Sequence, residues 1–346
     1  MSLLNPDSWT LFQAISVFSL CALVIAVAGT RITRVVDQLA DRTGIGEAAA
    51  GAVLLGASTS IGGSVLSVTA AWNGHAELAV SNALGGIAVQ TFFLALADMA
   101  YRKANLEHAA ASVPNMMQNG LLISLLGFIL LAPFTPEFTV WGIHPITPLL
   151  FGFYIYGIRL VRGSQEEPMW TAVSTSDTLE DVPDDTRKMP SLPQLWMEFT
   201  LLFLVLGITG WLLEPSATTI AAEAGISHTV IGVLLTAVCT SIPELVTSIA
   251  AVRRGALTLA VGGIIGGNAF DTLFTAASDV AYRDGSIYHQ MSDDALFWVS
   301  LTMVMSGVLM MGLIRRERQG LARIGLESVS ILVLYAAGVA ILVSGA

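Results

Sequence analysis

The chain has little of the charge that keeps a soluble protein in water. Only 12% of its 346 residues are charged, 54% are hydrophobic, and the mean hydropathy is +0.71. A soluble protein of this size carries about twice that charged fraction. The two cysteines, Cys21 and Cys239, both fall inside apolar runs, so we predict no disulfide. Apolar runs long enough to cross a bilayer recur from end to end, which predicts an integral membrane protein without a separate soluble domain.

Absent motifs narrow the function further. The sequence has no glycine-rich P-loop for ATP, which disfavours a primary pump. Its five histidines fall at predicted loops or helix ends and form no metal-binding pattern. Hydrolase signatures are missing as well. We therefore expect neither an enzyme nor a bound cofactor, and no nucleic-acid partner.

The apolar runs predict ten transmembrane helices. Barrel strands would appear as short alternating segments, and these runs do not alternate. The predicted helices span residues 10–30, 45–72, 76–101, 115–133, 143–161, 194–213, 228–252, 257–281, 294–314 and 322–344.

The basic residues predict how these helices cross the bilayer. When ten helices alternate in direction, all but one of the 16 Lys and Arg residues fall on one side, and only Arg283 falls on the other. Basic loops stay in the cytoplasm, so that side is predicted to be cytoplasmic. The prediction is a multi-pass protein of the cell membrane with both termini extracytoplasmic and the middle loop cytoplasmic.

The second strong pattern is an internal duplication. Residues 46–108 match residues 227–289 without a gap, and roughly a third of the positions are identical. The two copies run in opposite directions across the bilayer, which predicts two inverted five-helix halves, 1–162 and 194–346. Duplicated halves of this kind are typical of transporters whose binding site lies where the halves meet.

A polar segment, residues 163–193, joins the two halves. It is rich in proline, serine and acidic residues, and we interpret it as a solvated cytoplasmic linker. A regulatory or calcium-sensing role is the alternative, although its acidic residues lack the spacing of a twelve-residue calcium loop.

Glu244 is the strongest local indication of function, because a buried carboxylate inside a membrane is costly and is usually functional. Pro243 precedes it, and a proline within a helix disrupts hydrogen bonding to the previous turn, which frees carbonyl groups near Ala237. The hydroxyl groups of Thr240 and Ser241 lie within one turn. Together these oxygens suit Na⁺ or Ca²⁺. An ordinary proline kink is the alternative interpretation.

Asp271 is the second carboxylate within an apolar run, and Asn268 precedes it by about three-quarters of a turn. The alternative is glycine-mediated packing with an incidental polar pair, because two glycines precede them. At equivalent positions the first copy offers only neutral groups. Thr59 and Ser60 match the hydroxyl residues of the second copy, and Gln90 matches Asp271.

A further matched pair of acids lies near helix ends. Asp98 and Asp279 occupy equivalent positions, each followed by a Tyr-Arg pair. We interpret them as interfacial anchors, with a vestibule that attracts cations as the alternative.

The second copy resembles the second α-repeat of the calcium/cation antiporter superfamily, which contains the sodium/calcium exchangers and their proton-coupled relatives. The residues that carry the resemblance are Thr240-Ser241-Ile242-Pro243-Glu244 and Gly266-Gly267-Asn268-Ala269-Phe270-Asp271. The resemblance extends over nearly the whole chain and implies a sodium/calcium exchanger-like, all-α membrane fold and a monomer.

In that superfamily both repeats normally carry Thr-Ser-x-Pro-Glu, and the two glutamates face each other around the calcium. The resemblance implies that Glu244, Asp271, Thr240 and Ser241 bind the cation, with Thr59 and Ser60 as first-repeat partners. The first repeat departs from the pattern. It has a glycine, Gly63, in place of the glutamate and Gln90 where asparagine is usual.

Two carboxylates can neutralise one Ca²⁺, or two Na⁺ or H⁺. The sequence therefore predicts a secondary antiporter that exchanges Ca²⁺, or a related cation, for Na⁺ or H⁺, with a stoichiometry below three to one. A Na⁺/H⁺ antiporter that moves no calcium is the main alternative. A passive channel and a homologue that has lost transport are less favoured. The expected partners are inorganic cations and the lipid bilayer.

Overall fold

The computed structural model describes residues 9–43, 52–101, 104–166, 170–171, 173, 190–254, 257–318, 320 and 324–345. The start of the first copy and most of the predicted acidic linker lie outside the described residues. Across the described residues the chain is helical, and the only extended pairing is an isolated bridge between Val140 and Ile143.

Helices account for both halves of the chain. The first half contains α1 (Leu11–Thr43), α2 (Ala52–Thr59), α3 (Ile61–Trp72), α4 (Ala76–Ala100), α5 (Leu106–Ala109), α6 (Val113–Leu131), η4 (Ala132–Phe134) and α7 (Ile146–Glu166). The second half contains α8 (Leu192–Ala224), α9 (His228–Val230), the π-helix η6 (Ile231–Thr236), α10 (Ala237–Thr240), α11 (Ile242–Arg254), α12 (Leu257–Ala281), η7 (Ile287–Gln290), α13 (Asp293–Arg315) and α14 (Leu326–Gly345).

Among the described residues, six helices are long and apolar enough to cross a membrane. A seventh span arises if the segments 228–240 and 242–253, bent by 45°, are counted as one. The protein is therefore an all-helical, multi-pass membrane protein in the part of the chain that the structure describes.

Two helices are longer than their apolar runs predicted. The predicted helix 10–30 continues as α1 to Thr43, and the predicted helix 194–213 continues as α8 to Ala224. Charged residues end an apolar run but not a helix, because arginine and glutamate are good helix formers. Arg31, at the start of the α1 extension, pairs with Glu198 near the start of α8 at 2.5 Å, so the polar end of α1 still packs on α8.

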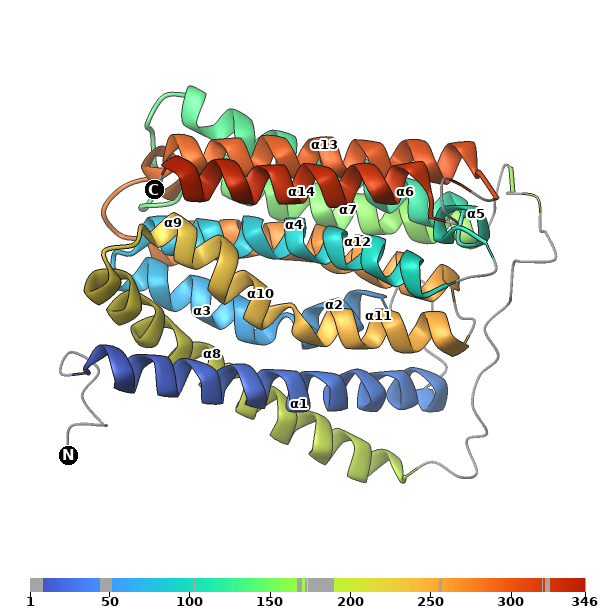
Figure 1. Ribbon diagram of the computed structural model, residues 1–346, viewed down its shortest axis with the longest axis horizontal. Helices are drawn as coiled ribbons and strands as arrows, with labels where there is room; N and C mark the ends of the chain where they lie inside the picture. Colours follow the sequence, from blue (N-terminus) through green and yellow to red (C-terminus); the bar gives the residue numbers. More distant parts are fainter. Residues whose placement is uncertain are drawn as a thin grey trace.

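The helices are layered around two buried ones. Figure 1 shows α1 and α8 along one side of the molecule, α13 and α14 along the opposite side, and α4 and α12 between them. In its most apolar window, 78% of α4 is buried, against 22% for α1 and for α8. A helix that is apolar on all sides and buried forms the core of a membrane protein. Helices α1 and α8 pack most extensively on each other and expose apolar side chains outward, among them Phe12, Leu20, Leu23, Leu201, Leu204 and Trp211.

The two copies share a break in the helix at equivalent positions. Ser60 separates α2 from α3 with φ −85° and ψ 2°, and Ser241 separates α10 from α11 with φ −97° and ψ 2°. Pro243 gives a reason for the second break, because a proline within a helix removes a hydrogen bond and kinks the helix. The first break has no such cause, since Gly62 occupies the equivalent position.

Helices α1 and α8 cross these breaks through glycines. Gly29 of α1 lies against the ring of Pro243, and Gly210 of α8 lies against the carbonyl group of Gly62. A Cβ atom at either glycine would overlap its neighbour, so only glycine permits this approach. Each long helix therefore rests on the broken helix of the other half.

The matched acids Asp98 and Asp279 connect the two halves through hydrogen bonds to backbone N–H groups. Asp98 Oδ1 accepts from the backbone N–H of Leu106 at 2.7 Å, and Oδ2 accepts from that of Gly325 at 3.1 Å. Asp279 repeats this arrangement with Ile287 at 3.2 Å and His144 at 2.8 Å. The hydrogen bonds recorded for these carboxylates thus tie each helix end to a nearby loop and to the segment that precedes the last helix of the opposite half.

Candidate cation-binding site

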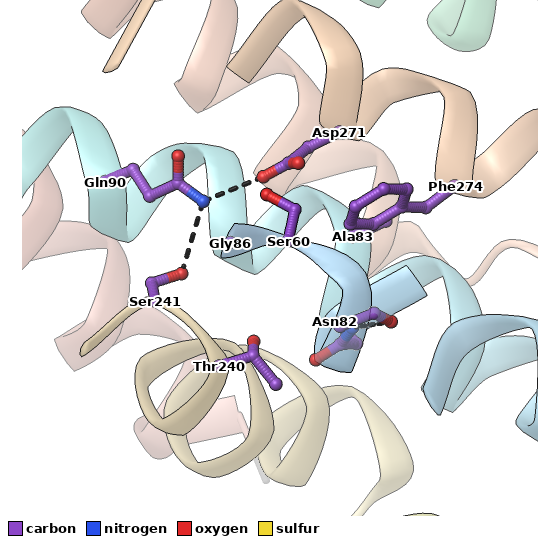
Figure 2. A pocket seen from close by; sticks show the side chains of 10 residues that line it. Ser60, Asn82, Ala83, Gly86, Gln90, Thr240, Ser241, Asp271 and Phe274 are labelled. Carbon is purple, nitrogen blue, oxygen red and sulfur yellow. Dashed lines mark hydrogen bonds between the residues drawn. The ribbon is translucent and has the colours of Figure 1, made fainter. Parts of the chain in front are cut away.

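The two helix breaks meet α4 and α12 around a small buried cavity, drawn in Figure 2. The cavity has room for about one water-sized particle. Its walls come from both copies of the duplication and consist mostly of small and polar residues. They are Ser60, Gly63, Asn82, Ala83, Gly86, Gln90, Thr240, Ser241, Asp271 and Phe274.

Asp271 is a buried carboxylate that lines the cavity, and a second buried carboxylate, Glu244, lies beside it in contact with the cavity residue Ser60. The exposed fraction is 7% for Glu244 and 2% for Asp271. Neither forms an ion pair with a described lysine or arginine, and each has one oxygen, Glu244 Oε2 and Asp271 Oδ1, with no hydrogen-bond partner. Charge without a counter-ion inside a membrane protein is unfavourable. A cation between these carboxylates would supply the missing partner.

Side chains of the first copy reach these carboxylates from the opposite half. Ser60 Oγ lies 3.5 Å from Glu244 Oε1, and Ser60 also contacts the Asp271 carboxylate. Gln90 Nε2 donates to Asp271 Oδ2 at 2.7 Å and to Ser241 Oγ at 3.4 Å. Figure 2 shows Ser60, Gln90, Ser241 and Asp271 converging on the cavity. The two copies therefore build one polar centre together.

Two further predicted hydroxyl groups belong to the same region. Thr240 lines the cavity, with its hydroxyl donating to the Thr236 carbonyl at 2.9 Å, which leaves oxygen lone pairs free. Thr59 donates to the Gly56 carbonyl at 3.2 Å and also contacts the Glu244 carboxylate.

The other two predicted site residues are less open to a ligand. The carbonyl oxygen of Ala237, predicted to be free, accepts from the Ser241 N–H at 3.1 Å and from the Thr240 hydroxyl at 3.3 Å. Asn268 is fully buried and donates to Thr91 Oγ1 at 3.0 Å, but it is not among the residues that line the cavity.

Sequence reasoning missed Asn82, which lines the cavity from α4. Its equivalent in the second copy is Gly263, so the comparison between copies gave no indication of it. The remaining signal was an amide side chain within a mostly apolar helix that also contains Ser81, Gln90 and Thr91.

All the polar atoms on the cavity wall and on the two carboxylates are oxygens or amide groups. Such ligands suit hard cations such as Na⁺ and Ca²⁺ rather than soft transition metals. Among the described residues, no group of three or more His, Cys, Asp or Glu is placed to hold a metal ion. The two carboxylates, supplemented by neutral oxygens, set an upper limit of about two positive charges.

Comparisons with known proteins agree with this chemistry. The putative antiporter CaxA of Alkalimonas amylolytica is 27% identical over 264 residues, which cover 75% of this chain and 77% of CaxA. Sodium/calcium exchanger MaX1 of Methanosarcina acetivorans is 46% identical over 68 residues, which cover 20% of this chain and 19% of MaX1.

Solved structures share the fold. The H⁺/Ca²⁺ exchanger CAX aligns with a TM-score of 0.68 at 13% identity, covering 96% of this chain and 86% of CAX. The sodium-calcium exchanger NCX_Mj aligns with a TM-score of 0.59 at 19% identity, covering 96% of this chain and 99% of its own.

The family model described as sodium/calcium exchanger protein matches residues 13–161 and 194–344, nearly the whole chain. On this match the chain belongs to the sodium/calcium exchanger family and thus to the calcium/cation antiporter superfamily.

Proposed function

We propose that the protein is a secondary active antiporter that exchanges Ca²⁺, or a related cation, for Na⁺ or H⁺. The observation that carries the proposal is the buried pair Glu244 and Asp271, each with an oxygen that lacks a hydrogen-bond partner. The two charges neutralise one divalent cation when it is bound. The same charges are neutralised by two monovalent ions on the return step, which makes the exchange electroneutral.

The proposed ligands come from both copies. Glu244 and Asp271 supply charge, and the neutral groups complete the ion's oxygen shell. The neutral candidates that line the cavity or contact a carboxylate are Thr59, Ser60, Gln90, Thr240 and Ser241. Because Gln90 and Ser60 connect the carboxylates to the opposite half, a movement that separates the halves would also take the ion's ligands apart.

The proposed architecture has ten transmembrane helices in two inverted halves, residues 1–162 and 194–346, with a cytoplasmic linker at 163–193. Both termini lie outside the cytoplasm. Alternating access follows from a movement of α1 and α8 against the remaining helices. Their extensive mutual packing and their glycine contacts with the two helix breaks support this role.

A Na⁺/H⁺ antiporter that moves no calcium is the second candidate. Gly63 favours it, because the site lacks the third acidic side chain that a glutamate at this position would supply. Two carboxylates are sufficient for a monovalent ion or a proton, and calcium sites commonly gather more oxygen ligands of negative charge.

Ion flux in proteoliposomes tests the proposal. The purified protein is reconstituted, labelled Ca²⁺ is placed outside, and gradients of Na⁺, K⁺ and pH are imposed separately. We expect one of the Na⁺ or pH gradients to drive Ca²⁺ uptake and Glu244→Gln to abolish it. Glu327→Gln, a buried acid on α14 away from the cavity, is the matched control. Unchanged fluxes in Glu244→Gln would exclude the proposed site. Na⁺ movement against a pH gradient without any Ca²⁺ movement would select the second candidate.

A further inference from the structure

Asn82 lines the cavity and carries an amide oxygen that neither carboxylate contacts. Asn82 is 2% exposed, and its amide oxygen Oδ1 has no hydrogen-bond partner. The other end of the amide is fully used, because Nδ2 donates to the Gly63 carbonyl at 3.1 Å and to Ser67 Oγ at 2.9 Å. The Gly63 carbonyl can only accept, so the amide nitrogen must face it and the oxygen must point away.

The position of Asn82 relates it to the missing acid. Gly63 lies between Asn82 and Thr240, since a Cβ atom at Gly63 would come within 3.4 Å of Thr240 Oγ1. In Figure 2, Asn82 lies toward Thr240, whereas the Asp271 carboxylate lies with Ser60 and Gln90. The cavity therefore has a carboxylate end and an uncharged end, and the uncharged end lies beside Gly63.

The two copies differ at both positions. The first copy has Gly63 where the second has Glu244, and Asn82 where the second has Gly263. The half of the chain without an acid at the break thus carries a buried amide directly beside the vacant position. A buried amide oxygen without a partner is unfavourable. A cation with which it shares its lone pairs would remove that penalty.

We infer that Asn82 Oδ1 and the Thr240 hydroxyl form a second, uncharged cation position that accepts a monovalent ion of the Na⁺ type. Whether the ligand oxygens are charged or neutral determines which ion they bind. The desolvation penalty of an ion rises with the square of its charge, so a divalent ion stays at the carboxylates and a monovalent ion can use neutral oxygens.

This inference rests on the proposed function and deepens it. Two Na⁺ ions that replace one Ca²⁺ cannot occupy the same point, because they repel each other. One takes the place of Ca²⁺ at Glu244 and Asp271, and the other lies at Asn82 and Thr240. Because the cavity has room for about one water-sized particle, its walls must move apart when both ions bind. Asn82 then contributes to the binding of Na⁺ but not to the binding of Ca²⁺.

Competition binding to the purified protein tests the inference without transport. Labelled Ca²⁺ is bound at equilibrium and displaced by increasing Na⁺. In Asn82→Ala we expect the Na⁺ concentration for half-displacement to rise about tenfold, with Ca²⁺ affinity changed by less than about threefold. The Hill slope for Na⁺ should fall from about 2 towards about 1. Asn119→Ala is the control, since Asn119 is a buried asparagine on α6 whose Oδ1 also lacks a partner, away from the cavity.

Asn82→Asp separates a ligand from a structural role. At alkaline pH a carboxylate here attracts Na⁺ more strongly, so a ligand role predicts opposite shifts in Asn82→Ala and Asn82→Asp. A structural role predicts that both variants weaken Ca²⁺ and Na⁺ binding together, because neither can donate to Gly63 and Ser67, and that result overturns the inference. Failure of Na⁺ to displace Ca²⁺ from the unmodified protein overturns it as well, while a proton-coupled exchanger would survive. Loss of all Ca²⁺ movement in flux would instead remove the proposed function.

Discussion

Gln90 donates a hydrogen bond to Asp271 over 2.7 Å, and these two residues occupy equivalent positions in the two copies of the duplication. A symmetric protein would bring two identical side chains together here. Two aspartates at this distance would repel each other, and two glutamines would carry no charge for a cation. The observed pair combines one donor with one carboxylate. Gln90 thereby holds one oxygen of Asp271 in place and leaves the other available.

Removing the amide should weaken cation binding without abolishing it. Gln90→Met keeps the approximate size of the side chain but loses its donor, so Asp271 is no longer held. We expect about a tenfold loss of cation affinity, which corresponds to one buried hydrogen bond to a charged group. Isothermal titration of the purified protein measures it. Gln118→Met, a buried glutamine on α6 outside the cavity, is the control and should bind normally.

A third acid should change the charge moved in each cycle. In Gly63→Glu the first atoms of the new side chain meet Thr240 and Phe274 only at ordinary contact distances, 3.4 and 3.6 Å. The extra negative charge requires one more monovalent ion per divalent ion. Exchange by the unmodified protein should be indifferent to an imposed potassium-diffusion potential, whereas the variant should respond to it. A variant that transports but stays indifferent to the potential would contradict the charge-counting argument.

The approach of α8 to the first helix break should be essential for transport. A Cβ atom in Gly210→Ala overlaps the Gly62 carbonyl, so the helices must separate or shift. We expect gradient-driven flux to fall by about tenfold or more, a barrier increase of roughly 1.4 kcal/mol. Gly207→Ala on the same helix is the matched control, because its Cβ would only touch Val65 at 4.0 Å. Equal fluxes in both variants would show that this crossing is unimportant.

The stability of the folded protein should depend on pH through the ionisation of Glu107. Burial, and then the nearby Asp98 carboxylate, raise the pKa of Glu107 from 4.5 to about 7. The folded protein then keeps a proton that the unfolded chain has already released. The stability from this group is complete below about pH 4.5 and is lost as the pH rises through about 7.

Glu107→Gln cannot ionise and can still accept the hydrogen bond from Ser328. At pH above about 8 it should therefore be more stable than the unmodified protein, by up to about 3 kcal/mol. Below about pH 4.5 the difference should vanish. Thermal unfolding in detergent across this pH range measures it, with the more exposed Glu317→Gln as control. A constant difference at every pH would assign the effect to packing.

Charge within apolar runs was enough to predict polar residues that the structure brings together, whereas cation binding by these residues stays a prediction. Glu244 and Asp271 stood out because charge in an apolar run is expensive, and the duplication then indicated Ser60 and Gln90 as their counterparts. Asn82 was not predicted as a site residue, because its counterpart in the second copy is a glycine. Its proposed role as a ligand also depends on which atom of its amide lacks a hydrogen-bond partner. That information exists only once α3 packs against α4.

The sequence predicted which segments are helical more completely than it predicted where those helices bend and end. The bend at Ser241 could be expected from Pro243, but the equivalent bend at Ser60 has no sequence signal that we can name. Helix α1 continues well beyond its apolar run, because lipid exposure ends where charge begins whereas hydrogen bonding along the helix does not. The ten-helix inverted arrangement and the orientation of the termini stay predictions.

The hydrogen bonds of Asp98 and Asp279 help to hold the two halves together. Each carboxylate belongs to one half and accepts a hydrogen bond from the backbone just before the last helix of the other, at Gly325 and at His144. Two hydrogen bonds thus connect the halves, and neither depends on the linker that joins the halves in the chain. Expressed as two separate polypeptides, residues 1–162 and 194–346 should find each other in the membrane and co-purify as a complex. Replacing both aspartates with alanine should weaken the complex without abolishing it, because α1 and α4 of the first half still pack on α8 and α12 of the second.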